Sequence, residues 1–303
     1  MFKASLNLAL AMVIVGSSVV AGKIMVDSLP VFLSSGLRFL LASALILPVL
    51  FLKEGGFPKL SRRSWAILAL QALCGSFLFT VCLLFGLRHV SPASAGIITS
   101  TTPAFMGLIG LFFFREKISV PVMAGITLSL AGILVLNTGA EGGGGGSSAL
   151  GFLLVLGAVA AESMFLVFRK WINDPLSPLA ATALISLLGL FWFLPASIYE
   201  YIVTDISAVP VLGWCAVIYY GVVVTVLAYL FWFAGVVHVP ASVAGIFTGI
   251  MPVSAVCLSA LLLGEELRWF HYSGCFLVLA GIMLISGVFS RYKILRGASV
   301  QDI

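Results

Sequence analysis

The chain has 303 residues, of which 61% are hydrophobic and only 9% are charged, and its formal net charge is +5. A soluble domain averages roughly 45–50% apolar and about 25% charged residues. A soluble globule leaves much of its surface in water, so it cannot hide this much apolar surface inside. The composition therefore excludes a soluble enzyme, a nucleic-acid-binding protein, a secreted disulfide scaffold and a disordered chain, and it indicates an integral membrane protein.

Ten apolar stretches are long enough to cross a bilayer, whose ~30 Å hydrocarbon core requires roughly 20 helical residues. They cover residues 6–22, 31–52, 65–87, 91–114, 118–137, 150–168, 178–202, 210–236, 240–263 and 270–290. The breaks between them carry helix-start signals, such as Ser91 followed by Pro92. The predicted fold class is an all-α integral membrane protein with ten transmembrane helices.

The distribution of Lys and Arg predicts the orientation. If the N-terminus is cytoplasmic, the loops on that side hold 12 of the 16 basic residues and the opposite loops hold 3, while Arg38 lies inside a span. Because cytoplasmic loops carry an excess of Lys and Arg, we expect both termini in the cytoplasm, with the protein in the bacterial inner membrane. A cleaved signal peptide is an alternative for the first span, but that apolar run is long for one.

An internal repeat relates the two halves. At a shift of 149 residues, positions 86–136 match positions 235–285 with 15 identities and no gap, and Pro103 falls on Pro252. We therefore predict a first five-helix repeat at 1–137, a Gly-rich external loop at 138–149, a second repeat at 150–290 and a short basic cytoplasmic tail at 291–303. Since five is odd, the second repeat must be inverted, an arrangement typical of secondary transporters.

Two ionisable residues inside spans are the strongest candidates for a functional site. Glu162 is near the middle of the sixth span and Arg38 lies within the second. A charge at that depth is costly unless it faces protein or water, so each is a candidate for binding substrate or coupling ions. Glu162 is expected to carry a proton or to bind a substrate ammonium group; a structural pairing with Arg38 is the alternative.

Several hydroxyl groups recur at repeat-related positions and are candidates for lining a cavity. Ser76 and Thr80 are four residues apart on the third span, and a matching pair occurs on the eighth. Hydrogen bonding to the backbone of the same helix is the alternative for each. The remaining members of this group are Thr225, Tyr229, Thr99 and Thr248.

Two prolines and two glutamates are candidates for helix breaks or gates. Pro103 and Pro252 lie mid-span in the fourth and ninth spans, where each removes a backbone hydrogen bond and kinks its helix. Glu116 and Glu265 stand at opposite membrane faces, each just before a following helix. We expect each carboxylate to cap that following helix, or to form a gate contact that changes between states.

The repeated motif resembles the drug/metabolite transporter superfamily, specifically its EamA-type members. In the first half it runs from Ala95-Gly96 through Pro103 and Arg115-Glu116 to a final helix with Gly125 and Gly132. In the second half the corresponding residues are Ala244-Gly245, Pro252, Gly264-Glu265, Gly274 and Gly281. The resemblance implies a ten-helix secondary carrier that exports amino acids or related metabolites.

Together these observations predict a secondary transporter that moves a small organic metabolite by alternating access, with protons as a candidate coupling ion. Its partners are then the substrate and the lipid bilayer, in a monomer or homodimer. An importer or exchanger of larger, nucleotide-sugar-like solutes is one alternative. An intramembrane enzyme or sensor that uses Glu162 and Arg38 is another, although we expect no enzymatic activity. No cofactor, nucleic-acid or metal site is expected, since no phosphate-binding loop or metal-ligand spacing is present.

A reporter fused at Gly144 tests the predicted topology. This position lies in the predicted external loop, so a reporter that is active only outside the cytoplasm should be active there, while fusions at either terminus should report the cytoplasm. A cytoplasmic signal from Gly144 would overturn both the orientation and the ten-span arrangement.

Overall fold

The computed structural model describes residues 2–112, 119–142, 149–236, 238–239, 244 and 247–286. Several predicted features lie outside the described residues: Arg115, Glu116, Gly245, the glycines of the external loop from 143 onward, and the tail at 291–303. Within the described ranges every regular element is a helix. The predicted all-α fold is therefore confirmed.

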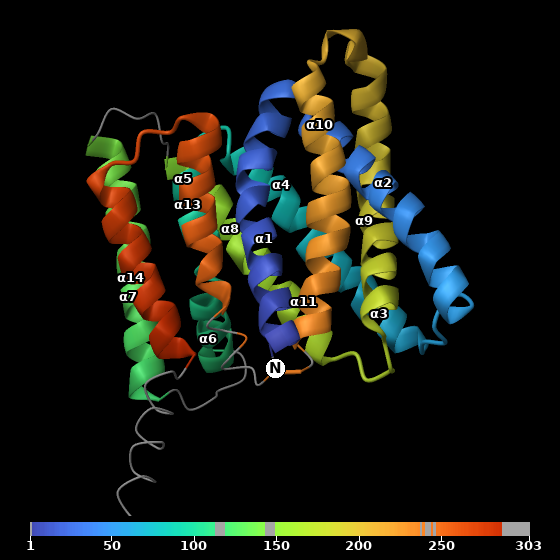
Figure 1. Cartoon of the computed structure of the whole chain (residues 1–303), viewed down its shortest axis with the longest axis horizontal. Coiled ribbons are helices and arrows are strands. Elements are labelled where there is room, and N and C mark those ends of the chain that lie inside the picture. The colour runs from blue at the N-terminus through green and yellow to red at the C-terminus, as the bar shows by residue number, and fades with distance from the viewer. Residues whose placement is uncertain are drawn as a thin grey trace, which may run out of the picture.

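Ten helical spans follow one another along the chain (Figure 1). Eight are long and apolar enough to cross a membrane, and two shorter apolar helices follow them in the described part of the chain. In order, they are α1 (Phe2–Ser28), α2 (Val31–Glu54), α3 to α4 (Arg62–Gly86), α5 to α6 (Pro92–Phe112), α7 (Val120–Gly142), α8 (Ala149–Lys170), α9 (Pro178–Val203), α10 to α11 (Val211–Val236), α13 (Ile250–Leu263) and α14 (Trp269–Ile285). The ten-span prediction is confirmed.

Several of these spans depart from a continuous α-helix within the described residues. The third consists of α3 (Arg62–Ala72), the π-helical segment η1 (Leu73–Leu78) and α4 (Phe79–Gly86). The eighth consists of α10 (Val211–Tyr219), the π-helical segment η3 (Tyr220–Leu227) and α11 (Ala228–Val236). The fourth is divided into α5 (Pro92–Thr99) and α6 (Thr102–Phe112). A shift of 149 residues places η1 inside η3, so the irregularity occurs at the same place in both halves.

The pattern of packing also repeats between the halves. Helix α1 of the first half packs against α13 and α11, among other helices. The equivalent helix of the second half, α8, packs against α6 and α4, which are the repeat equivalents of α13 and α11. The helices α2 and α9, which are also equivalent, pack against one another. Figure 1 shows the N-terminus and the end of α14 at the same end of the bundle, as an even number of spans requires.

Helices α7 and α14 lie side by side at one edge of the bundle (Figure 1), and glycines allow their close approach. A Cβ atom on Gly125 would lie 2.7 Å from the carbonyl oxygen of Gly281, and one on Gly132 would lie 2.9 Å from that of Gly274. The repeat equates Gly125 with Gly274 and Gly132 with Gly281. The two contacts are therefore exchanged by a two-fold rotation, which supports the inverted arrangement of the halves.

Carboxylates of the second half bind helix starts of the first half at both ends of the bundle. Glu200 Oε2 accepts a hydrogen bond of 2.7 Å from the backbone N–H of Leu33, in the first turn of α2. In the loop before α9, Asp174 Oδ2 accepts bonds of 2.8 Å from both the N–H and the hydroxyl of Ser61, the N-cap residue of α3. These bonds hold the pKa of Asp174 below its ordinary value. Backbone N–H groups at helix starts of the first half thus find hydrogen-bond acceptors in the second half.

Replacing Gly125 by Leu tests the packing of α7 against α14. The added side chain meets the backbone of Gly281, so we expect a loss of about 1–3 kcal/mol of stability, measured as a lower melting temperature in detergent. The matched control is Ala124→Leu, because Ala124 is the neighbouring residue and is exposed. Equal melting temperatures for the two variants would contradict this packing.

Candidate functional site

A cavity of about 90 Å³ lies among the spans and contains both charged residues that the sequence placed inside the membrane. Its walls come from α1, α2, the third and fourth spans, α8, the eighth span and α13. The polar or charged lining residues are Ser18, Arg38, Thr99, Glu162, Tyr220, Thr225 and Tyr229. This volume is smaller than the roughly 300–1,000 Å³ of common ligand pockets, so a bound metabolite requires the bundle to open.

The guanidinium group of Arg38 is held by aromatic rings and one hydroxyl. Its central carbon lies 4.3 Å from the ring centroids of both Phe39 and Tyr220, which is within cation–π range. Its Nη2 donates a hydrogen bond of 2.8 Å to Thr80 Oγ1, while its buried Nε has no hydrogen-bond partner within the described ranges. Because a guanidinium stays charged, this arrangement presents a fixed positive group to the cavity.

Glu162, on α8, supplies the negative group of the same cavity. Its Oε2 accepts a hydrogen bond of 2.6 Å from Thr102 Oγ1. No ion pair within 4.0 Å joins Glu162 to Arg38 in the described part of the chain. The salt bridge between the two, which the sequence left open as an alternative, is therefore not present in the described residues, although both side chains line the same cavity.

The predicted hydroxyl residues of the third and eighth spans differ in their roles. Thr225 and Tyr229 line the cavity, whereas Thr80 accepts a hydrogen bond from Arg38, which lines it. Ser76 is buried within η1, does not line the cavity, and its hydroxyl has no hydrogen-bond partner among the described residues. Thr225 Oγ1 donates 2.9 Å to the carbonyl of Tyr220, five residues earlier, which is the spacing of the π-helix.

The fourth and ninth spans are both broken near the predicted prolines. Pro103 is the second residue of α6, and Pro252 is the third residue of α13, which begins after Gly249. Proline is tolerated there because the N–H groups of a helix's first turn have no partner within the helix. Thr99 ends α5 and lines the cavity, whereas Thr248 lies before α13 and is not part of the cavity wall.

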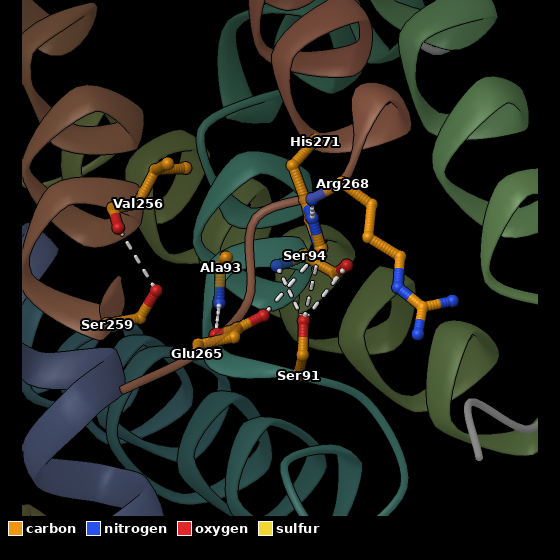
Figure 2. Close-up of polar contacts among 8 residues, drawn as sticks. All are labelled: Ser91, Ala93, Ser94, Val256, Ser259, Glu265, Arg268 and His271. Atoms are coloured by element: carbon orange, nitrogen blue, oxygen red, sulfur yellow. Dashed lines mark hydrogen bonds and ion pairs between the residues drawn. The ribbon is translucent and has the colours of Figure 1, made fainter. Parts of the chain in front are cut away.

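Glu265 caps a different helix from the one that the sequence suggested (Figure 2). Its Oε2 accepts a hydrogen bond of 3.0 Å from the N–H of Ala93, in the first turn of α5, and its Oε1 lies 3.5 Å from His271 Nε2. The expectation that Glu265 caps α14 is wrong, because His271 Nδ1 already accepts the Arg268 N–H at the start of that helix, at 3.0 Å. The carboxylate therefore links the α13–α14 loop of the second half to the fourth span of the first.

Residue Thr102 was missed by the sequence reasoning, although it binds Glu162. It belongs to a run of four hydroxyl residues, 99–102, that directly precedes Pro103 and is buried in mid-span. That run is an unusual feature for a membrane-spanning stretch and could have drawn attention to it. The repeat did not help, because the position equivalent to Thr102 is Met251.

The described residues offer no group of three or more His, Cys, Asp or Glu side chains that could hold a metal ion. The five cysteines are free, and none of them lines the cavity. The polar groups that line the cavity are charged and hydroxyl side chains, which bind ligands through charge and hydrogen bonds.

Two related proteins and one solved structure are similar to this chain over most of its length. The chain is 43% identical over 283 residues to the uncharacterized transporter YetK of Bacillus subtilis, which covers 93% of this chain and 86% of that protein. It is 28% identical to a protein of Salmonella typhimurium named probable amino-acid metabolite efflux pump, over 97% of each chain. A solved crystal structure, 21% identical, has a TM-score of 0.65 and covers 93% of this chain and 98% of its own, which supports the fold.

The family comparison divides the chain in the same way as the internal repeat. The profile of the EamA-like transporter family matches twice, over residues 2–138 and 149–287. Together the two matches cover nearly all of the sequence, and they place the central cavity between two copies of one domain. The chain belongs to the EamA-like transporter family.

Proposed function

We propose that this transporter is a secondary carrier that exports a small amino acid or a related zwitterionic metabolite by alternating access. The observation that carries the proposal is the presence of Arg38 and Glu162, oppositely charged and unpaired with each other, in one cavity. An amino acid carries a carboxylate and an ammonium group on neighbouring atoms. Arg38 suits the carboxylate and Glu162 suits the ammonium.

The inverted repeat supports alternating access, because two equivalent halves can rock between an inward-open and an outward-open state around a central site. Protons suit the role of coupling ion, since Glu162 is a carboxylate in the cavity that can release its proton when the cavity opens to water. The name of the Salmonella relative points to the same substrate class and to export.

Glu162→Gln in proteoliposomes tests the substrate and coupling role. Gln keeps the shape and the hydrogen bond but cannot ionise, so flux of radiolabelled amino acids driven by a pH gradient should fall roughly tenfold or more, with little change in melting temperature. The Arg38→Gln variant should no longer prefer an amino acid over the carboxamide of that amino acid, which lacks the carboxylate. The Glu162→Gln variant should no longer prefer an amino acid over its N-acetyl derivative, which lacks the ammonium group. Full flux and unchanged selectivity in both variants would contradict the proposal.

The contact between Glu265 and α5 is proposed as the gate at the external end. The carboxylate ties the α13–α14 loop to the helix whose last residue, Thr99, lines the cavity. Opening this end separates α5 from α13, and the link across them must then break. A carboxylate at a helix N-terminus contributes about 0.3–1 kcal/mol, so its loss should favour the outward-open state.

Glu265→Gln measures the strength of this gate. In a background without native cysteines, Thr99→Cys reports opening through its rate of labelling by a maleimide that does not cross membranes. We expect Glu265→Gln to raise the rate by up to roughly fivefold, which corresponds to about 1 kcal/mol. The matched control is Glu266→Gln, because Glu266 is the exposed neighbour. The same labelling rate in all three proteins would rule out a gate here.

A further inference from the structure

Thr102 occupies a position between the charged site and the break in the fourth span. It is the first residue of α6, it is buried, and it directly follows the interruption at Ser100 and Thr101. Its Oγ1 lies 2.6 Å from Glu162 Oε2 and 2.9 Å from the carbonyl oxygen of Thr99. One side chain thus contacts both the carboxylate and the backbone of the break.

In a continuous helix, the carbonyl of Thr99 would accept a hydrogen bond from the backbone N–H of residue 103, which here is Pro103. In an α-helix the N–H of each residue bonds to the carbonyl four residues earlier, and residue 103 is four residues after Thr99. Proline has no N–H, so this donor is missing. The hydroxyl of Thr102 is placed to supply the missing bond.

A hydroxyl group has a single proton, so Thr102 cannot donate to both neighbours at full strength. When Glu162 is ionised, both its oxygens only accept, and the short bond draws the hydroxyl proton away from Thr99. When Glu162 is protonated, its own O–H can donate to Thr102 Oγ1, and Thr102 can then donate to the Thr99 carbonyl. The two protonation states therefore leave the break in the fourth span with different hydrogen bonding.

We propose that Thr102 is the positioning residue that transmits the protonation state of Glu162 to the break in the fourth span. The inference rests on the proposed role of Glu162 in proton coupling. Protonation completes the bond across the break and stiffens it; ionisation releases the Thr99 carbonyl and lets α5 and α6 move relative to one another. The fourth span also carries the helix start that Glu265 caps, so the proton site is joined to the external gate through α5.

Other charged and titratable groups face the same space. Arg38 enters from α2, Tyr220 from η3 and Tyr229 from α11, and the electrostatic neighbours of Tyr229 are Arg38, Glu162 and Tyr220. Of these groups, none makes a hydrogen bond to the Thr99 carbonyl in the described structure, so the connection to the break passes through Thr102.

Thr102→Val and Thr102→Ser provide the test, with the pH dependence of flux in proteoliposomes as the readout. Valine keeps the shape but removes the hydroxyl, so the ionised carboxylate loses a donor. We expect the pH of half-maximal flux to rise by about one unit. Serine keeps the hydroxyl and should restore the wild-type profile. Thr102→Ala serves in the same way if the valine variant does not insert.

The matched control is Thr101→Val. Thr101 is the adjacent buried residue, and its hydroxyl also bonds to a carbonyl three residues earlier, that of Ile98 at 2.6 Å. In the described structure, the hydroxyl that binds Glu162 is that of Thr102, not that of Thr101. This variant should alter stability without moving the pH profile. An unshifted profile for both Thr102→Val and Thr102→Ala would overturn the inference, as would an equal shift for Thr101→Val.

The same measurements separate this inference from the proposed function. If wild-type flux depends on pH and Glu162→Gln abolishes that dependence, the coupling role stands whatever the Thr102 variants do. If Glu162→Gln retains the wild-type pH profile, the coupling role fails, and the inference about Thr102 falls with it.

Discussion

Inside a bilayer, charged and polar groups find their partners within the protein, and this constraint organises the whole bundle. Arg38 meets it through two aromatic rings and Thr80, and Glu162 through Thr102. Both therefore point inward, which creates a polar centre in a chain that is otherwise mostly apolar. The two side chains share the central cavity, and no ion pair joins them in the described residues.

The same constraint acts at the helix ends. Glu200, Asp174 and Glu265 belong to the second half, and each binds the start of a helix in the first half. A helix that moves relative to the opposite half must give up such a bond or carry its partner along. The halves are thus joined at the ends of the spans by single hydrogen bonds. Along α7 and α14, by contrast, they are joined by the close packing of two helices at their glycines.

The large features could be predicted from the sequence because they depend on local composition. Ten apolar stretches and the rare ionisable residues within them stand out, and so do the prolines at the breaks. The helix that Glu265 caps could not be predicted, because the bond joins residues 172 positions apart and another residue already caps the nearer helix. Thr102 was missed since hydroxyl residues are common in membrane helices and its importance depends on two neighbours, Glu162 and the carbonyl of Thr99. The π-helical segments were also not predicted, because no residue pattern in the sequence indicated them.

Those π-helical segments have a consequence for how relatives of this chain are compared. A π-turn accommodates one more residue than an α-turn without interrupting the helix, and each residue of an α-helix turns the chain by about 100°. In the third span, η1 therefore sets the direction in which the side chains of α4 point relative to those of α3. In the eighth span, η3 does the same for α11 relative to α10. A single-residue gap inside a transmembrane helix would ordinarily be taken for an alignment error. Here it would be a structurally inexpensive change that turns Thr80, or Tyr229, to a different wall of the bundle.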